Sequence, residues 1–361
     1  MSGTVFVINE SEVSTCPSHM VLPFDASKTT KIGWGGYSTV YKEIIAIHHF
    51  KYKRKPSPTS PILNEVVSAR LIDHQSLLMN SKAPLPVACK RFPYAPDFHR
   101  EWEFLQSLNV SPHRHVGVIQ ELAALLHDDT YHLLLPLADS DLANLLIQTD
   151  VSTLSLKDLL NQASGLADAL SWLHGGIHTL DGRKLIACHI DMKPSNILVF
   201  HLEESSSAGT WLITDFSTST LTDGDGTELL PAPRIVEDIY SAPELQAQPE
   251  KNRASPECDV WSLGCILFEI LLCFVDGREE SVEWRDEWGN MPCFHKERMG
   301  ERGLASRLHQ WLSEGVLSDS AESQRVESFK KLVLGTLKIV PAERPTAEDL
   351  KKSLTSIFSQ C

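Results

Sequence analysis

The sequence lacks an excess of basic residues. Its 33 Lys and Arg residues stand against 47 Asp and Glu residues, which gives a formal net charge of −14 at pH 7. A protein with this balance is repelled by the phosphate backbone of nucleic acids and by anionic lipid headgroups. We therefore expect neither nucleic acid nor a membrane as a partner.

The sequence also lacks close cysteine pairs, a leader and a long apolar run. Its eight cysteines form no Cys-x-x-Cys, which argues against a zinc knuckle or a redox dithiol. The first residues show no basic start followed by an apolar stretch. The longest apolar run, residues 260–274, is shorter than the roughly 20 residues of a bilayer span and contains Glu269. These absences predict an intracellular protein, either cytoplasmic or nuclear.

Short strand-like segments dominate the first part of the chain, and helical patterns dominate the rest. Runs with strand-like composition lie at 29–32, 39–47, 85–92 and 131–137, and two more at 196–200 and 210–216. Between residues 156 and 173, leucine and alanine recur at steps of three and four, as on one helix face, and Ser155 with Asp158 resembles a capping box. Residues 260–274 are typical of a buried helix. The predicted fold class is α+β with two segregated lobes.

A glycine cluster lies between the first two strand-like segments. Residues 33–40 read Gly-Trp-Gly-Gly-Tyr-Ser-Thr-Val. Glycines let backbone N–H groups come close to phosphate oxygens. A glycine-rich hairpin turn without a ligand is the alternative interpretation. A Rossmann site is disfavoured, because a strand follows the cluster where that site needs a helix.

A lysine and a glutamate stand eleven residues apart after this cluster. Lys90 lies near the end of the strand-like run at 85–92, and Glu101 lies on a predicted helix. A lysine held by a carboxylate can be aimed at nucleotide phosphates. Taken alone, the pair is equally well explained as a surface salt bridge.

The most specific run begins at His189. Asp191 can accept a hydroxyl proton, Lys193 can offset charge on a transferred phosphoryl group, and Asn196 can offer an oxygen ligand. Asp215 adds a second acid at the end of another predicted strand. Oxygen ligands of this kind suit Mg²⁺ that carries phosphates. Two acids alone could form a glycosidase-like pair, but the spacing with Lys193 and Asn196 argues against it.

These motifs together resemble those of the eukaryotic protein kinases over about residues 26–357. The likeness extends to Ala-Pro-Glu at 242–244, to Asp-Val-Trp-Ser-Leu-Gly at 259–264 and to Arg-Pro-Thr at 344–346. It implies a bilobal protein-kinase-like fold after an N-terminal tail at 1–25. The small β-rich lobe would span about 26–137 with a loop insertion at about 51–82. The larger helical lobe would span about 138–357.

The resemblance also implies a serine/threonine kinase that uses Mg²⁺ and ATP on protein substrates. The oligomeric state is left undetermined. Catalytic roles would fall on Lys90, Glu101, Asp191 and Lys193, and Mg²⁺ would bind Asn196 and Asp215. It further implies that Glu244 pairs with Arg344 and that Asp259 holds the catalytic-loop backbone. The implied ATP-binding positions are Ile32, Gly33, Trp34, Gly35, Gly36, Tyr37, Ser38, Val40, Ala88, Lys90, Leu135, Leu137 and Leu198.

Several positions depart from the family pattern. Ser38 replaces the third loop glycine, and Ser217 replaces the glycine of Asp-Phe-Gly, which removes backbone freedom there. Ile190 replaces the arginine before the catalytic aspartate, so we expect activity without phosphorylation of residues 215–244. Glu237 stands where a threonine is usual, and we expect it to repel Asp191. The missing arginine and the lengthened segments before Lys90 and His189 look like a group of kinases from filamentous fungi.

Two alternatives to a protein kinase remain at this point. A kinase-like scaffold that binds ATP with feeble transfer is favoured by Ser217 and Glu237 and opposed by the complete catalytic set. A small-molecule phosphotransferase of the related fold is opposed by the Ala-Pro-Glu and Asp-x-Trp-Ser-x-Gly motifs, which those enzymes usually lack.

Overall fold

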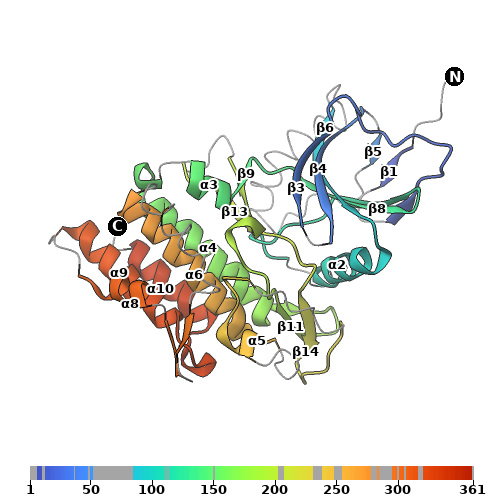
Figure 1. The fold of residues 1–361 in the computed structure, drawn as a ribbon. Coiled ribbons are helices and arrows are strands. Elements are labelled where there is room, and N and C mark those ends of the chain that lie inside the picture. The colour runs from blue at the N-terminus through green and yellow to red at the C-terminus, as the bar shows by residue number, and fades with distance from the viewer. Residues whose placement is uncertain are drawn as a thin grey trace. The chain divides into compact units, whose positions relative to one another are not determined.

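The computed structural model describes residues 6–9, 13–35, 37–47, 49–51, 84–109, 111, 114–148, 151–201, 207–230, 238–247, 254–277, 283, 295–298, 301–304, 306–315 and 320–359. The chain divides into two compact units. The first comprises Met1–Asn109 and Val118–Asp139, and the second comprises Val110–Gly117 and Ser140–Cys361. The strand-rich first unit and the helix-rich second unit match the predicted α+β class (Figure 1).

A six-stranded sheet forms the centre of the first unit. In spatial order its strands are β2 (Val13–Thr15), β7 (Ala123–His127), β8 (Thr130–Pro136), β6 (Leu85–Phe92), β4 (Thr39–Ile45) and β3 (Thr30–Trp34). Helix α2 (Ala95–Leu108) packs on β6 and β8 through Phe98, Phe104, Leu105 and Leu108, which are all buried. The sequence predicted β3, β4, β6 and β8, but it missed β2 and β7. Both missed strands lie at one edge of the sheet.

The N-terminal segment is part of the first unit, where a tail at 1–25 was expected. Besides β2, which pairs in parallel with β7, the strand β1 (Ile8–Asn9) pairs in parallel with β5 (Phe50–Lys51). Ile8 is fully buried beside Phe50 in the core cluster, and Phe24 packs against the same cluster. Strands of two or three residues are too short to show a period, which explains why the sequence pattern missed them. Of the expected insertion at 51–82, residues 52–82 lie outside the described residues.

The buried N-terminal segment gives a testable expectation. The substitution Ile8→Ala should lower the free energy of unfolding by about 2–5 kcal/mol, since it leaves a cavity in the core. Urea unfolding followed by fluorescence measures this change. The matched control is Val21→Ala in the same segment, where the side chain is 69% exposed and the expected change is within about 0.5 kcal/mol. Equal midpoints for the two variants would show that the segment is dispensable.

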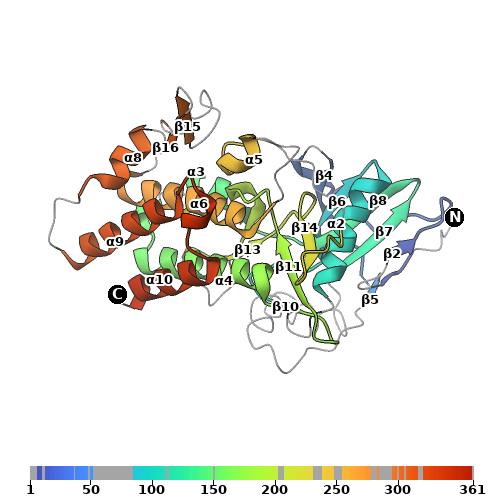
Figure 2. The ribbon, with the colours of Figure 1, turned by 90° about the horizontal axis from the view of Figure 1, so that it is seen from below.

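Helices form most of the second unit. The long helices lie side by side, with α4 packed on α10 and α6 packed on α9 (Figures 1 and 2). The Ser155 hydroxyl accepts the Asp158 N–H at 3.3 Å, which confirms the predicted start of α4. The helices are α3 (Leu142–Gln148), α4 (Leu156–Gly175), α5 (Pro243–Ala247), α6 (Pro256–Val275), α8 (Ser306–Ser313), α9 (Ala321–Thr336) and α10 (Ala347–Ser359), with 3-10 turns at Val151–Thr153, Pro194–Asn196 and Pro341–Glu343.

Helix α6 is the central helix of this unit. It runs for 20 residues, longer than the predicted 260–274. By length and composition alone it could cross a membrane, but 89% of its apolar window is buried inside the unit. Its apolar residues on all sides therefore belong to a core helix surrounded by protein.

Short sheets flank the functional loops of the second unit. One has the order β13 (Thr210–Ile213), β12 (Ile197–Phe200), β9 (Ser140–Asp141). Another has the order β10 (Ile177–His178), β11 (Lys184–Cys188), β14 (Thr220–Asp223), and a hairpin joins β15 (His295–Arg298) to β16 (Glu301–Leu304). The loop with His189 and Asp191 connects β11 to β12, and the segment with Asp215 connects β13 to β14. The two sheets thus fix both ends of each functional loop.

Candidate active site

A fully buried carboxylate binds the backbone of the loop that follows β11. Asp259 of α6 accepts the backbone N–H of His189 at 2.8 Å and that of Ile190 at 2.7 Å. The ring of His174 lies 3.0 Å from the same carboxylate. Ile190 has φ +71°, which a β-branched residue adopts only under strain. These bonds hold the strained turn in place, and they confirm the expected role of Asp259.

The same loop is joined to the segment that carries Asp215. The His189 ring lies 2.8 Å from the Thr214 carbonyl oxygen and packs against the Phe216 ring at a centroid distance of 5.0 Å. The Thr214 N–H donates to the Asn196 carbonyl oxygen at 3.0 Å. The two segments that bear the predicted acids are therefore joined by a backbone hydrogen bond and by the contacts of the His189 ring.

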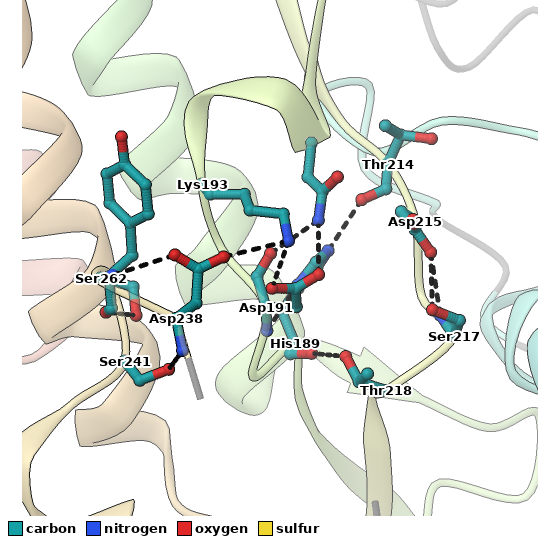
Figure 3. A network of polar contacts seen from close by, with 12 residues as sticks. His189, Asp191, Lys193, Thr214, Asp215, Ser217, Thr218, Asp238, Ser241 and Ser262 are labelled. Carbon is teal, nitrogen blue, oxygen red and sulfur yellow. Dashed lines mark hydrogen bonds and ion pairs between the residues drawn. The ribbon is translucent and has the colours of Figure 1, made fainter. Parts of the chain in front are cut away.

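Three predicted site residues meet within this loop (Figure 3). The Lys193 ammonium donates to the Asp191 carboxylate at 2.9 Å. The Asn196 amide donates to the other Asp191 carboxylate oxygen at 3.0 Å and to the Asp191 carbonyl oxygen at 2.8 Å. Burial raises the pKa of Asp191 above its ordinary value, and Lys193 opposes that rise. A carboxylate with this setting is oriented and less acidic than a solvated one, which suits a group that accepts a proton.

Asp215 lies two residues beyond β13, where the sequence predicted it at the strand end. Its φ is +63°, a left-handed conformation that aspartate tolerates. The Ser217 hydroxyl donates to the Asp215 carboxylate at 2.8 Å (Figure 3). Ser217 thus orients the acid in addition to filling the position of a glycine.

A contact that the sequence analysis missed reaches Lys193 from the segment before α5. The Asp238 carboxylate accepts from the Lys193 ammonium at 3.2 Å. Burial lowers the pKa of Lys193, but Asp191 and Asp238 outweigh it and bring the pKa above its ordinary value. Glu237, which we expected close to Asp191, lies outside the described residues. The usable signal was a second acid adjacent to Glu237 and four residues before the Ala-Pro-Glu run.

In the first unit, Lys90 and Glu101 form a buried ion pair. The Lys90 ammonium lies 2.6 Å from the Glu101 carboxylate, and both residues are at most 5% exposed. This burial excludes the alternative of a surface salt bridge. Phe92 adds an aromatic ring 5.4 Å from the ammonium.

The glycine cluster forms the turn between two antiparallel strands. Gly33 and Trp34 end β3, Val40 lies at the start of β4, and the Gly35 N–H donates to the Ser38 carbonyl oxygen at 2.9 Å. Gly36 and the side chain of Trp34 lie outside the described residues. The remaining expected ATP-binding residues are placed as follows: Ile32 in β3, Tyr37 in the turn, Ala88 in β6, Leu135 in β8, Leu137 just after β8, and Leu198 in β12 of the second unit.

The expected pair of Glu244 and Arg344 is also present. The Arg344 guanidinium donates to both Glu244 carboxylate oxygens, at 2.6 and 2.7 Å. The bidentate pair fastens α5 to the turn before α10, and Trp261 of α6 lies 5.1 Å from the guanidinium. The segment that ends in α5 therefore has a fixed anchor.

A thiol and an imidazole form one further buried pair. In the sheet of the first unit, the Cys89 thiol lies 3.5 Å from the His132 ring. Burial raises the pKa of Cys89 to about 12 and lowers the pKa of His132 to about 4. Both groups are therefore neutral near pH 7, and the pair lacks the thiolate that a nucleophile needs.

Removal of the buried carboxylate under the loop tests its role. The substitution Asp259→Ala leaves two buried N–H groups without an acceptor, so the free energy of unfolding should fall by about 2–6 kcal/mol. The control is Asp225→Ala, where the side chain is exposed and the change should stay within about 0.5 kcal/mol. Equal thermal midpoints for the two variants would contradict this account of the loop.

Comparison with known proteins agrees with the site geometry. The family model for the Protein kinase domain matches residues 85–354. The chain therefore belongs to the protein kinase family. The match begins at β6, so the glycine cluster lies before it.

Several curated proteins are similar to this chain. "Probable serine/threonine-protein kinase PBL20" of Arabidopsis thaliana is 25% identical over 99% of this chain and 76% of its own length. Mouse ribosomal protein S6 kinase alpha-4 is 30% identical over 46% of this chain and 19% of its own length. The inactive leucine-rich repeat receptor-like protein kinase CORYNE of Arabidopsis thaliana is 24% identical over 55% of this chain and 43% of its own length. The chain thus spans well under two thirds of the latter two proteins.

Proposed function

We propose that this protein kinase transfers the γ-phosphoryl group of Mg-ATP to serine and threonine hydroxyls of protein substrates. The observation that carries the proposal is the Asp191 carboxylate, held by Lys193 and Asn196 on a loop whose backbone is fixed by Asp259. In this arrangement Asp191 orients the acceptor hydroxyl and takes its proton. Lys193 balances the negative charge that develops on the phosphoryl oxygens.

The donor set fits a magnesium ion that arrives with phosphates. The Asn196 amide nitrogen is bonded within the loop, which leaves its oxygen for a cation, and Asp215 supplies a carboxylate. In the described part of the chain, no three His, Cys, Asp or Glu side chains gather into a metal site. Mg²⁺ is commonly held by one or two protein oxygens together with phosphate oxygens, and it would neutralise phosphate charge here.

The first unit supplies groups suited to the phosphates. Lys90, fixed by Glu101, would hold them as an oriented positive charge. At Gly35 an added Cβ would meet nothing within 4 Å, and at Gly33 it would make only ordinary contacts with Val40. The described protein itself therefore does not demand glycine at either position. A phosphate that binds close to the backbone N–H groups would explain why glycine occupies these positions.

Two observations support serine and threonine as acceptors. Lys193 stands two residues after Asp191, which is similar to serine/threonine kinases, whereas tyrosine kinases usually have alanine there. The first relative above is named a probable serine/threonine-protein kinase. We further propose an intracellular location, cytoplasmic or nuclear. In support, the cysteines of the described residues are buried thiols rather than disulfides, which suits a reducing compartment.

A catalytically weak scaffold that binds ATP is the second candidate. It is favoured by Ser217, whose hydroxyl engages the proposed metal ligand Asp215 at 2.8 Å. Phosphate transfer separates the two candidates, because a scaffold would bind ATP and transfer little.

Transfer of labelled phosphate to an array of Ser, Thr and Tyr peptides tests the proposal. The parent protein should label Ser and Thr peptides, and Asp191→Asn should reduce kcat by about 10²–10³-fold, since it removes the proton acceptor. The asparagine keeps an oxygen for Lys193, so the thermal midpoint should change little. ATP binding without labelling by the parent would favour the scaffold, and labelling of Tyr peptides alone would contradict the proposed acceptors.

The start of the activation segment, residues 215–230, is held by strand pairing. Strand β14 pairs with β11 over four residues, from Cys188 opposite Thr220 to Leu185 opposite Asp223. The hydroxyls of Thr218 and Ser219 are buried and donate to the His189 carbonyl oxygen at 3.3 and 3.1 Å. A kinase that modified these hydroxyls would first have to unfold the segment.

We therefore expect activity that does not depend on phosphorylation of this segment. The double substitution Thr222→Ala with Thr227→Ala removes its more accessible threonines without touching the buried hydroxyls. Both this variant and a phosphatase-treated parent should keep kcat within about twofold, because Ile190 offers no charge to a phosphate. Loss of turnover with retained ATP binding in either sample would contradict this expectation.

A further inference from the structure

Lys193 shares its ammonium between two carboxylates from different segments. One is Asp191, two residues away, and the other is Asp238, which lies 45 residues further along the chain (Figure 3). The Lys193 side chain is 25% exposed, and the two acids are 16% and 25% exposed. A partly buried ion pair such as this one is screened less than a surface pair. The second contact therefore constrains the lysine.

The backbone turn that carries Asp238 is itself held by hydrogen bonds. The Ser241 hydroxyl accepts the Asp238 N–H at 3.1 Å, and the Ser241 N–H donates to the Asp238 carbonyl oxygen at 2.9 Å. The turn is tied to α6, because the Ser262 hydroxyl donates to the Tyr240 carbonyl oxygen at 2.8 Å and the Tyr240 hydroxyl bonds to Glu269. Asp238 thus lies on a turn that hydrogen bonds fix to helix α6.

The two fixed carboxylates determine the direction of the remaining N–H group of the Lys193 ammonium. A lysine ammonium has three N–H donors on a flexible four-carbon stem. With Asp191 alone, the group can rotate and swing about a single contact. With Asp238 as a second anchor from another direction, both the nitrogen position and the direction of the third N–H are set. That third donor is the one left to meet a phosphoryl oxygen.

We propose that Asp238 is a positioning residue that holds Lys193 ready for the transferred phosphoryl group. This inference rests on the proposed kinase function. Asp238 acts through Lys193 and does not itself touch the reacting atoms. From the sequence we expected the neighbouring Glu237 to repel Asp191. The acid that the structure describes there is bound by the lysine.

Steady-state kinetics with a labelled Ser or Thr peptide test the positioning role. Asp238→Ala should lower kcat about tenfold or more, since a loosened contact to a reacting group costs rate, while KM for ATP stays within about twofold. Asp238→Asn keeps an oxygen acceptor of the same shape and should recover most of the lost rate. An equal loss in both variants, or a loss that appears in KM alone, would overturn the proposal.

A double-mutant cycle separates positioning from plain destabilisation. In a Lys193→Met background, Asp238→Ala should cause almost no further loss of kcat, because the residue it positions is gone. A structural role would instead lower kcat equally in both backgrounds and would follow the thermal midpoint. Additive losses in the cycle would overturn the proposal.

A measurement without catalysis tests the ion pair itself. In protein labelled with [13Cε]-lysine, the Lys193 signal is the one that disappears in Lys193→Arg. Its two ε-protons should have distinct shifts in the parent and merge into one sharper signal in Asp238→Ala. An unchanged signal would overturn the pairing whatever the activity. The expected signature in a parent that transfers no phosphate would leave the pairing intact and overturn the proposed function together with the positioning role.

Discussion

The carboxylate of Asp259 is the point on which the catalytic loop depends. It sits in an apolar helix with no exposure to solvent, where an unpaired charge would cost several kcal/mol by burial alone. It is stable there because it accepts the N–H groups of His189 and Ile190 and contacts His174. The same bonds hold Ile190 in a conformation that its branched side chain disfavours. The direction of Asp191, one residue later, follows from that turn.

From this point the site extends by short, directed links. The His189 ring contacts the Thr214 carbonyl oxygen, and this contact fixes the backbone next to Asp215. The Asn196 amide donates to the Asp191 carboxylate, and the Lys193 ammonium bridges the carboxylates of Asp191 and Asp238. Each link is made of hydrogen bonds or ion pairs between groups that are buried or partly buried. The second unit thus presents its reactive side chains from backbones fixed independently of any ligand, which is the preorganisation that electrostatic catalysis requires.

The sequence predicted the parts of the site whose geometry is set by close spacing. Asp191, Lys193 and Asn196 lie within one tight loop, so their residue types and intervals nearly determine their contacts. The Glu244–Arg344 pair was predictable only through the family resemblance, because 100 residues separate the partners. The contact between Lys193 and Asp238 was missed, since it depends on the path of the chain before α5, and no local pattern encodes that path. The strands β1, β2 and β7 were missed for another reason: their pairing partners, rather than their own composition, make them strands.

The parallel pairing of β2 with β7 sets an order of events during synthesis. Val13 lies opposite Ala124, so β2 has no partner strand until more than a hundred further residues have been made. At typical translation rates of about 5–20 residues per second, its apolar side chains wait on the order of 5–20 seconds before the sheet edge exists. Ile8 can pair with Phe50 earlier, but Leu122, Ala123 and Leu125 of its core cluster are made only at the end of that interval. The N-terminal segment of the nascent chain therefore exposes apolar surface until the first unit is complete. Surface of this kind is what chaperones bind.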